Sequence, residues 1–510
     1  MTTVVDLLFA AEDDGRPQYE RFADAVARAI DDGRLSGGAK LPTVRKLASE
    51  ASVSATTIMS MYARLSEHGY TTGEAGRGTF VNTPANERSA ALQGPGRRGD
   101  SAHRRSHPWR RRALAESEAR LRDRFPQAVD LMRGSPAARL LPLDIVRRSW
   151  GAAAKGYRTQ DLEYPLSLAI DPTLADLVGE RFAADGIASD REALVAVNSA
   201  QQCITLVAQV LVRSGEIVEG VAVERPLVAI EEPGYQTAMD TIERAGCNLH
   251  GLAVDERGVT PDALRAAVAA GVRLVVFTPR ALSPTGATWS AERRAELSNI
   301  LADARDVWVL EDDYFAELAE ARPGSISGDS RLRDRVVHVR SFSKSIGPDL
   351  RTAVAYVGAA VRGAFLEERS YADGWTSVFA QRTLAAILAD AKLPATLQVA
   401  ADQYRGNRAA AIERMAAQVG TSSLATEGTE GLHLWVKLPA GARSDAVVEA
   451  SAKRGVLVAD GEPFFLVPGR RNFIRVNVGA AEPSRLGEIS DAILRAIDES
   501  MGRGNLLFSP

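Results

Sequence analysis

The feature that most restricts the possible folds of this chain is a series of short apolar runs beyond about residue 129. These runs alternate with helical stretches. The runs are Leu194–Val197, Val228–Ile230, Leu274–Phe277, Val307–Leu310, Val336–Val339 and Val354–Val357. Strands that are buried on both faces are apolar throughout, and parallel strands are usually connected by helices. The pattern therefore predicts an α/β domain whose mainly parallel sheet is covered by helices on both faces.

Polar motifs follow several of these runs directly. They are Glu231-Glu232-Pro233-Gly234-Tyr235, Thr278-Pro279, Glu311-Asp312-Asp313-Tyr314 and Ser341-Phe342-Ser343-Lys344. In open α/β sheets, ligands bind beyond the carboxyl ends of the strands. We therefore expect these motifs to meet at one edge of the sheet.

The length and composition of the chain narrow its class. A chain of 510 residues that is 45% hydrophobic is too long for one ordinary core, so we expect a small and a large domain. The net charge of -3 is nearly balanced, and any basic surface must be local. Cys203 and Cys247 are too few for a disulfide framework or a cysteine zinc cluster, and we predict no metal site. With no long apolar run or basic leader, we expect a cytoplasmic protein without membrane contact.

The first eighty residues have the pattern of a winged helix-turn-helix. Apolar residues recur at helical spacing from Tyr19 to Asp32, where Gly33 is placed to end the helix. Thr43 and Ser54 can each cap a further helix. The glycine-rich turn that follows Tyr70 indicates a β-hairpin. We therefore predict a DNA-binding domain over residues 1–82.

In such a domain the N-terminal end of the recognition helix enters the major groove, and basic residues nearby contact phosphates. The candidate DNA-binding residues are Thr43, Arg45, Lys46, Ser54, Thr56, Thr57, Arg77 and Gly78. A winged helix that binds another protein is the alternative.

Residues 83–128 are predicted to form an arginine-rich linker, because they are rich in Pro, Gly, Ser and Arg and lack an apolar period. A polar helix begins near Ala115. The basic run either remains solvated or makes additional phosphate contacts. The second domain then occupies residues 129–510.

Lys344 stands out because lysine is scarce in this chain and this one lies in a polar loop at a strand end. Schiff-base chemistry needs an amine that can lose its proton, which arginine cannot do. Asp312 or Asp313 could pair with a protonated pyridine nitrogen, and Tyr314 could hydrogen-bond a ring oxygen. Together these groups suit pyridoxal phosphate (PLP).

A phosphate site is also predicted. The segment after Val197 opens a helix, and N–H groups at a helix start bind phosphate. The candidate phosphate ligands are Ser199, Ala200, Gln201, Ser341, Ser343 and Arg351. Each of these residues alone could be a helix cap or a surface residue, whereas their combination in this order favours PLP.

At this point the motifs resemble known families. Gln201-Gln202, Glu232–Tyr235, Thr278-Pro279, Pro284-Thr285-Gly286 and the segments around Asp312, Lys344 and Arg351 look like fold-type I aminotransferases, from about Val129 to the C-terminus. The segments Gly37–Ala48 and Gly76–Val81 are similar to GntR-type winged helices. This order of domains resembles MocR-type regulators.

The resemblance implies a role for each matching residue. Lys344 would form the Schiff base, Asp312 would bind the pyridine nitrogen, and Tyr314 would bind the ring oxygen. Tyr235 would stack on the ring, and Arg475 would receive the carboxylate of an amino-acid effector. The resemblance further implies a smaller C-terminal subdomain and a head-to-tail homodimer.

The chain departs from the resembling families at a few positions. Ala281 and Leu282 stand where relatives usually have His-Gln, Ser199 stands where they have glycine, and Ala55 replaces a common arginine. We expect a PLP-dependent transcriptional regulator that binds double-stranded operator DNA and senses PLP or an amino-acid or amine effector. The alternatives are an active aminotransferase with a DNA-binding appendage and a regulator that has lost PLP.

Overall fold

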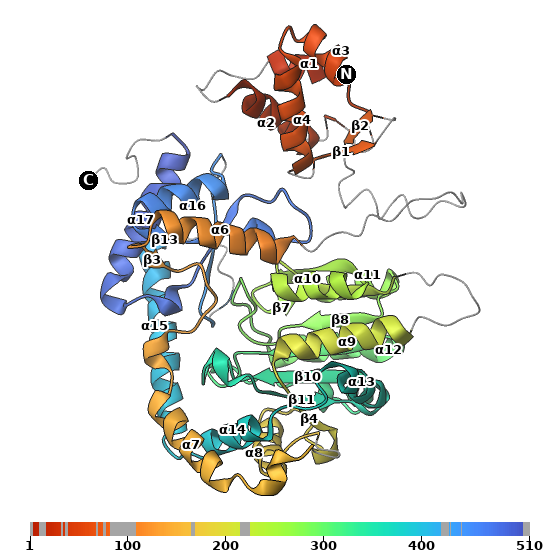
Figure 1. Cartoon of the computed structure of the whole chain (residues 1–510), viewed down its shortest axis with the longest axis vertical. Coiled ribbons are helices and arrows are strands. Elements are labelled where there is room, and N and C mark those ends of the chain that lie inside the picture. Colours follow the sequence, from red (N-terminus) through yellow and green to blue (C-terminus); the bar gives the residue numbers. More distant parts are fainter. Residues whose placement is uncertain are drawn as a thin grey trace, which may run out of the picture. The chain divides into compact units, whose positions relative to one another are not determined.

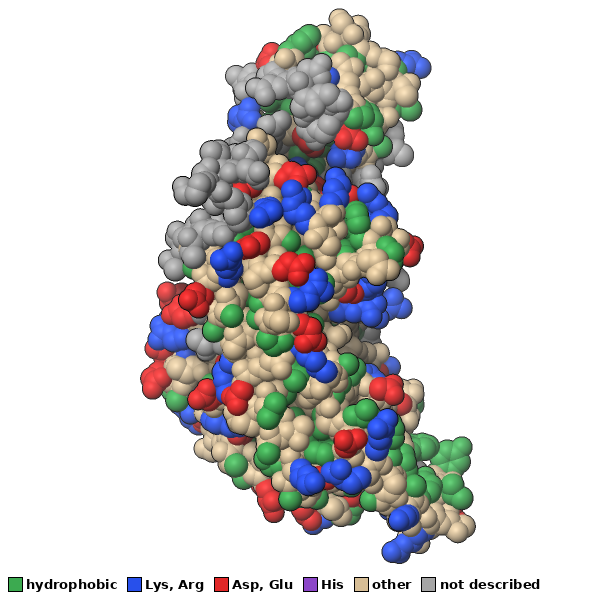
Figure 2. All heavy atoms as spheres, turned by 90° about the vertical axis from the view of Figure 1, so that its left-hand side faces the viewer, with side chains coloured by type: hydrophobic (Ala, Val, Ile, Leu, Met, Phe, Trp, Pro, Cys, Tyr) green, Lys and Arg blue, Asp and Glu red, His purple; other side chains and the backbone are tan. Residues whose placement is uncertain are grey.

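The computed structural model describes residues 4–9, 17–31, 34–35, 39–67, 70–74, 78–81, 109–164, 169–214, 225–419, 428, 430–439 and 441–502. The chain divides into two compact units, of which one comprises Met1–Arg104 with Val467–Gly469 and the other Arg105–Leu466 with Arg470–Pro510 (Figure 1). Over the face seen in Figure 2, basic and acidic side chains are interspersed, as the nearly balanced net charge leads one to expect.

The first unit is the predicted winged helix-turn-helix. Its elements are α1 (Val4–Phe9), α2 (Gln18–Asp31), α3 (Val44–Glu50), α4 (Ala55–Glu67) and an antiparallel hairpin of β1 (Thr71–Glu74) and β2 (Gly78–Val81). Thr43 caps α3, because its Oγ1 accepts a hydrogen bond from the backbone N–H of Lys46 at 3.3 Å. The sequence pattern did not indicate α1, and the expected helix-ending Gly33 lies outside the described residues.

An eight-stranded sheet forms the centre of the second unit, in the order β4-β11-β10-β9-β8-β5-β6-β7. The strands from β10 to β6 are parallel, whereas β11 is antiparallel to both neighbours and β7 to β6. Each predicted apolar run overlaps one of these strands, which confirms the mainly parallel sheet. Their bounds are β4 (Leu194–Val197), β5 (Leu227–Glu232), β6 (Asn248–Asp255), β7 (Gly258–Val259), β8 (Leu274–Phe277), β9 (Trp308–Asp313), β10 (Val336–Ser341) and β11 (Ala353–Val357).

Helices cover both faces of this sheet. Val195 and Val197 pack with α9 (Ala200–Ser214), α10 (Gln236–Ala245) and α13 (Ala359–Ala372). Leu194 and Ala196 point to the opposite face, because successive side chains of a strand alternate. The helices on that side are α7 (Leu143–Gly156), α8 (Pro172–Ala184), α11 (Pro261–Ala269), α12 (Ala291–Asp303) and α14 (Val378–Leu388).

A smaller C-terminal subdomain contains the antiparallel sheet β12-β15-β14. Its core also includes Leu114 and Leu121 of α6, which precedes the large sheet in the chain. A short strand from that early segment pairs in parallel with β13, which ties it to the subdomain. The elements are α6 (Arg110–Arg124), β3 (Val129–Asp130), α15 (Leu393–Val419), β12 (Leu434–Lys437), α16 (Ser444–Lys453), β13 (Val456–Leu457), β14 (Ala459–Asp460), β15 (Phe473–Val476) and α17 (Leu486–Ser500).

The linker prediction was wrong at its C-terminal end, because α6 belongs to the second unit. Arg110 is only 1% exposed, and its Nη1 lies 2.9 Å from Asp240 and 2.7 Å from Glu243 of α10. Its position among the arginines suggested a solvated or phosphate-binding side chain, but its acidic partners lie far along the chain. Residues 83–108 of the predicted linker lie outside the described residues.

Within the described residues, no single helix is long and apolar enough to cross a membrane. Only α14 followed by residues 393–416 of α15 meets the length and composition criteria as a pair, and this pair is bent by 82°.

Candidate functional site

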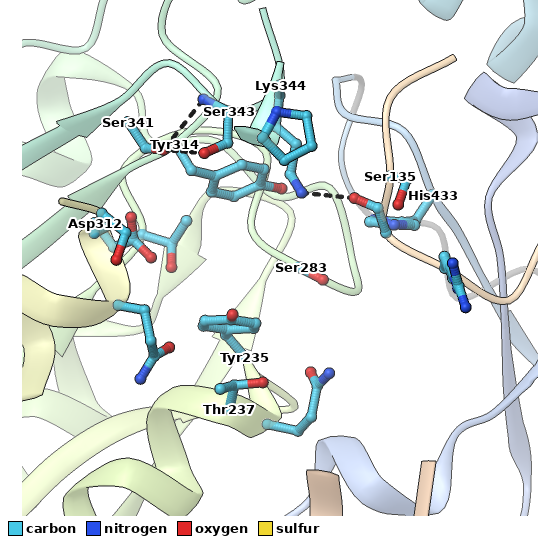
Figure 3. A pocket seen from close by; sticks show the side chains of 18 of the residues that line it. Ser135, Tyr235, Thr237, Ser283, Asp312, Tyr314, Ser341, Ser343, Lys344 and His433 are labelled. Atoms are coloured by element: carbon cyan, nitrogen blue, oxygen red, sulfur yellow. Dashed lines mark hydrogen bonds between the residues drawn. The ribbon is translucent and has the colours of Figure 1, made fainter. Parts of the chain in front are cut away.

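A pocket of about 410 Å³ lies at the carboxyl ends of β4, β5, β9 and β10 (Figure 3). Every residue predicted to bind the cofactor lines this pocket, together with Arg475. The fold explains the convergence, because strands that run in the same direction end at the same edge of the sheet. The lining residues that were predicted are Ser199, Ala200, Gln201, Tyr235, Asp312, Tyr314, Ser341, Ser343, Lys344, Arg351 and Arg475.

The two neighbouring aspartates that could pair with a pyridine nitrogen point in different directions. Asp312 lines the pocket, while the next residue, Asp313, binds Arg280 and Arg340 away from it. The Oδ1 atom of Asp312 is buried and has no hydrogen-bond partner. Burial, together with the charge of Asp313, raises the pKa of Asp312 to about 7. A buried carboxylate oxygen without a partner is a position where a protonated ring nitrogen fits.

Lys344 extends from the loop after β10 and donates a hydrogen bond from Nζ to the backbone oxygen of Gly134 at 2.6 Å. Burial and the positive charge of Arg475 lower the pKa of Lys344 to about 8. The unprotonated amine, which is the nucleophilic form, is therefore available at neutral pH to a larger extent than in an ordinary lysine.

Hydroxyl groups and backbone N–H groups gather at one end of the pocket. Ser199 caps α9, because its Oγ accepts a hydrogen bond from the backbone N–H of Gln202 at 3.0 Å. The hydroxyl groups of Ser341 and Ser343 lie 3.1 Å apart. Arg351 follows in a left-handed conformation with φ of 49°. A helix N-terminus, two hydroxyls and a guanidinium are suitable ligands for a phosphate group.

The two tyrosines of the pocket come from different loops. Tyr235 precedes α10, and Tyr314 follows β9. The hydroxyl of Tyr314 donates a hydrogen bond to the backbone oxygen of Ala281. Ala281 and Leu282, where the resemblance implied substitutions, are both buried in the protein core. These two substitutions therefore put apolar side chains into packed positions.

Arg475 on β15 is buried, and its Nη2 donates to the backbone oxygen of Met132 at 2.5 Å. Its Nε has no hydrogen-bond partner, and its guanidinium carbon lies 4.6 Å from the centre of the Phe464 ring. Burial lowers the pKa of Arg475 to about 10. The guanidinium remains charged at neutral pH and can donate hydrogen bonds to a carboxylate.

Sequence reasoning missed several lining residues. Leu114 and Glu118 come from α6, Gly134 from the segment after β3, and His433 from the segment before β12. Burial holds the pKa of His433 well below its usual range, so this imidazole is neutral. None of these residues follows a long apolar run, and long-range contacts bring their segments to the pocket: the pairing of β3 with β13, the pairing of β12 with β15, and the bonds of Arg110 to α10.

The predicted DNA-binding residues lie on the winged helix as follows. Arg45 and Lys46 are exposed on α3, and Thr56 is exposed near the start of α4. The Oγ of Ser54 accepts a hydrogen bond from the backbone N–H of Thr57 at 3.0 Å and therefore caps α4. Gly78 begins β2 with φ of 120°, and Arg77 lies outside the described residues.

The donor set of the pocket fits PLP, since it combines an amine, a partnerless carboxylate oxygen, a phosphate-binding end and aromatic rings. Among the described residues, no group of three or more His, Cys, Asp or Glu side chains could hold a metal ion. The fold and the pocket thus define an aminotransferase-type domain attached to a winged helix.

Comparisons with known proteins agree with this class. Residues 135–493 match the family described as aminotransferase class I and II, and residues 18–81 match the gntR family of bacterial regulatory proteins. The chain therefore belongs to the class I and II aminotransferase family and carries a GntR-family head, the combination that MocR-type transcriptional regulators have.

Full-length relatives are named as regulators. The HTH-type transcriptional regulator TauR of Rhodobacter capsulatus is 30% identical, over 98% of this chain and 100% of the relative. The vitamin B6 salvage pathway transcriptional repressor PtsJ of Salmonella typhimurium is 27% identical, over 95% of this chain and 99% of the relative. A DNA-binding regulator is therefore the function that these comparisons support.

Among solved structures, an archaeal alanine:glyoxylate aminotransferase superposes with a TM-score of 0.67 at 19% identity, over 76% of this chain and 95% of that chain. The α-aminoadipate aminotransferase LysN of Thermus thermophilus superposes with a TM-score of 0.65 at 21% identity, over 77% of this chain and 99% of that chain. At such identities the likeness shows the fold.

Proposed function

We propose that this chain is a PLP-dependent transcriptional regulator that binds operator DNA through its winged helix and senses PLP, or an amino acid or amine, in the aminotransferase-type pocket. The observation that carries the proposal is the partnerless carboxylate oxygen of Asp312 in the same pocket as the amine of Lys344. When bound, PLP supplies a carbonyl group that condenses with primary amines and a ring that withdraws electrons.

Each pocket residue has a proposed role. Lys344 holds the cofactor through its side-chain amine, and Asp312 pairs with the ring nitrogen. Tyr235 stacks on the ring, Tyr314 hydrogen-bonds its oxygen, and Arg475 binds an effector carboxylate. The phosphate ligands are Ser199, Ala200, Gln201, Ser341, Ser343 and Arg351. PLP itself is supported as one signal by the relative that is named for vitamin B6 salvage.

Helix α6 is the first described element of the second unit in the sequence, and it contributes to the pocket. Its Leu114 and Glu118 line the pocket, and Arg110 anchors its first turn to α10. A cofactor that engages Lys344 competes with the hydrogen bond from Lys344 to Gly134. Occupancy of the pocket therefore biases the position of α6 and of the segment after β3.

We further propose a head-to-tail homodimer in the cytoplasm. Leu162, Tyr164 and Tyr371 are 75%, 82% and 72% exposed, and such apolar side chains suit a self-complementary contact. Tyr164 packs edge-on against Trp375, at 5.5 Å between ring centres, so Trp375 adds to this aromatic surface. Two heads would then bind paired half-sites. The free, buried Cys203 and Cys247 fit the reducing cytoplasm.

The test of the pocket is the visible absorption spectrum of the purified protein with added PLP, recorded beside the Lys344→Ala variant. The expected result is a protein-bound PLP band in the wild type that the variant lacks. A spectrum of free PLP in both proteins would reject PLP binding through Lys344. Addition of single amino acids to the loaded protein then identifies an effector by a shift of the band.

The test of the head is DNA affinity as a function of salt. Arg45→Ala should weaken binding and lower the slope of log affinity against log salt by about one, because one phosphate contact is lost. Arg265→Ala is the matched control, since Arg265 is an exposed arginine of the second unit. Equal affinity and slope in wild type and Arg45→Ala would reject the predicted phosphate contact.

A second candidate function is transamination, because the pocket combines Lys344, Asp312 and Arg475. These residues suffice to hold PLP and an amino acid and to move a proton at its Cα. Multiple turnovers with an amino acid and a keto acid at about 1 per second or faster would favour an enzyme. A single turnover without recycling would favour the regulator.

A further inference from the structure

The exposed face of the recognition helix α4 carries no charged side chain over its first turns. From Ala55 to Ala63 the sequence is Ala-Thr-Thr-Ile-Met-Ser-Met-Tyr-Ala. Ile58 and Met61 are fully buried, and they fix which side of the helix faces the core. The opposite side presents Ala55, Thr56 and Met59, and Met59 is 57% exposed.

The position of this face is well determined by polar contacts. The Oγ of Ser54 accepts a hydrogen bond from the backbone N–H of Thr57 and lies 2.8 Å from its hydroxyl, so the Thr57 hydroxyl is engaged within the cap. The hydroxyl of Tyr62 donates to the backbone oxygen of Pro42 at 2.7 Å and ties α4 to the segment before α3. The first basic residue of α4, Arg64, lies 3.9 Å from Glu20 of α2.

The chemistry of this face restricts which bases it can read. In the major groove, guanine is read by Arg or Lys, adenine by Asn or Gln, and cytosine by Asp or Glu. None of these six residue types occurs between Ala55 and Ala63, where the polar residues are Thr56, Thr57, Ser60 and Tyr62. Ser and Thr hydroxyls contact bases without a strong preference, so they do not set which base is read. The face instead offers the methyl groups of Ala55 and Thr56 and the thioether chain of Met59. Thymine is the one DNA base that presents a methyl group in the major groove.

Exposed basic residues of the head lie on α3. Arg45 and Lys46 are exposed on α3, where Lys46 also lies 3.8 Å from Glu50. Phosphate contacts from such residues add affinity without sequence preference. An exposed apolar residue by itself is ordinary on a protein surface. Met59, however, lies one turn beyond Ala55 on the helix that a winged helix-turn-helix inserts into the groove.

We propose that this regulator recognises thymine in its operator through the thymine methyl group, with Ala55 and Met59 forming the contacting surface. The proposal rests on DNA binding by the winged helix and specifies how that domain selects its sequence. Met59 loses exposed apolar surface when it packs on a methyl group, which favours the thymine-containing site.

The experiment uses the full-length protein and duplexes that it selects from a random DNA library. Each thymine of a selected duplex is then replaced by deoxyuridine, which differs only in lacking the methyl group. At the contacted positions we expect the affinity to fall about fourfold for each methyl group, the effect of one buried methylene. The affinity is measured by fluorescence anisotropy at fixed salt.

Variants separate this contact from general DNA binding. Met59→Ala should lose most of the preference for thymine over deoxyuridine, because only Ala55 then remains to contact the methyl group, whereas Met59→Leu should keep most of it. Arg45→Ala should weaken both duplexes by the same factor. Leu143→Ala is the matched control, because Leu143 is an exposed apolar residue of the second unit, and it should behave as the wild type. Since Met59 is exposed, its replacement should leave the fold intact, which circular dichroism verifies.

Wild-type protein that binds its selected duplex but tolerates deoxyuridine at every position would overturn this inference while leaving the regulator intact. A preference that survives Met59→Ala unchanged would also overturn the assigned residue. Failure of the wild type to select any DNA sequence would instead reject sequence-specific DNA binding, and with it the proposed function.

Discussion

Neighbouring carboxylates on the two faces of strand β9 have different surroundings. Asp312 points into the pocket, where one of its oxygens is buried without a partner and burial raises its pKa to about 7. Glu311 and Asp313 point to the other face, and both contact the buried His338 of β10. Their side chains differ in direction because strand residues alternate.

The second face is a closed network of charges. The Nδ1 of His338 lies 2.8 Å from Glu311, and its Nε2 lies 3.3 Å from Asp313. Asp313 also lies 2.8 Å from Arg280 and 3.0 Å from Arg340, and these guanidinium groups hold its pKa well below the usual range despite burial. The comparison shows that burial alone does not mark a functional carboxylate. Each aspartate has one buried oxygen without a hydrogen-bond partner, but only Asp312 lines the pocket, whereas Asp313 is bound by two guanidinium groups.

The largest expected effect comes from opening the closed network. Asp313→Asn removes a buried charge between Arg280 and Arg340, and loss of one member of a buried ion pair costs about 3–5 kcal/mol. We expect this decrease in the free energy of unfolding of the cofactor-free protein, measured by urea denaturation followed by circular dichroism. Asp312→Asn is the matched variant and should cost nothing at neutral pH, because the amide relieves an uncompensated buried group. Equal destabilisation of both variants would contradict the comparison.

The next effect concerns the cofactor. Asp312→Asn should weaken PLP binding by about 1.5–3 kcal/mol, the range for a hydrogen bond to a charged group, or roughly 10- to 100-fold. The measurement is an absorbance titration with PLP. Asp329→Asn is a suitable control, since Asp329 pairs with Arg331 at the surface. Unchanged PLP affinity in Asp312→Asn would show that this carboxylate does not contact the ring nitrogen.

The sequence was sufficient to predict the strands and the motifs at their ends, because apolar runs and polar strand ends are local patterns. The residues alone could not choose between Asp312 and Asp313, although the family resemblance implied Asp312. Neighbouring residues of a strand point to opposite faces, and the sequence does not show which face carries a pocket. The closed network was also hidden, since Arg280 and Arg340 come from other strand ends.

The sequence also did not predict that α6 lines the pocket, because this depends on long-range contacts. Leu114 and Leu121 are its buried leucines, seven residues apart among Arg and Glu, and this is a weak helical signal. Arg110 looked like one of many linker arginines, because its partners Asp240 and Glu243 are separated from it by about 130 residues. Long-range ion pairs leave no local trace in a single sequence.

Asp312 and Asp313, on opposite faces of β9, should make the free energy of unfolding depend on pH with opposite signs. The pKa of Asp312 is raised to about 7 in the folded protein, against about 3.9 in an unfolded chain. Its contribution to stability is therefore fully present below about pH 4 and lost as the pH rises to 7. The lowered pKa of Asp313 stabilises the fold above about pH 4, and this contribution is lost on acidification.

Urea denaturation at pH 5 and pH 8 separates these contributions. From pH 5 to pH 8 the free energy of unfolding of Asp312→Asn should rise relative to that of the wild type. Only the wild type has a buried carboxyl group that must ionise over this range. Asp313→Asn should remain less stable than the wild type by a similar amount at both. A constant difference between wild type and Asp312→Asn across this range would refute the assigned pKa.

The smallest effect should come from the phosphate end of the pocket, where each group is one of several ligands. Ser343→Ala removes one neutral hydroxyl, and a hydrogen bond of this kind contributes about 1 kcal/mol, or roughly fivefold in PLP affinity. Ser345→Ala is the matched control, because Ser345 lies two residues further on, is buried and donates to the backbone oxygen of Phe342 instead. The two variants should therefore differ in PLP titrations, and equal affinities would place the phosphate elsewhere in the pocket. A loss of PLP affinity as large as that of Asp312→Asn would mean that the Ser343 hydroxyl and the Asp312 carboxylate contribute equally to binding. The position of Asp312 on the pocket face of β9 would then not make it the stronger contact.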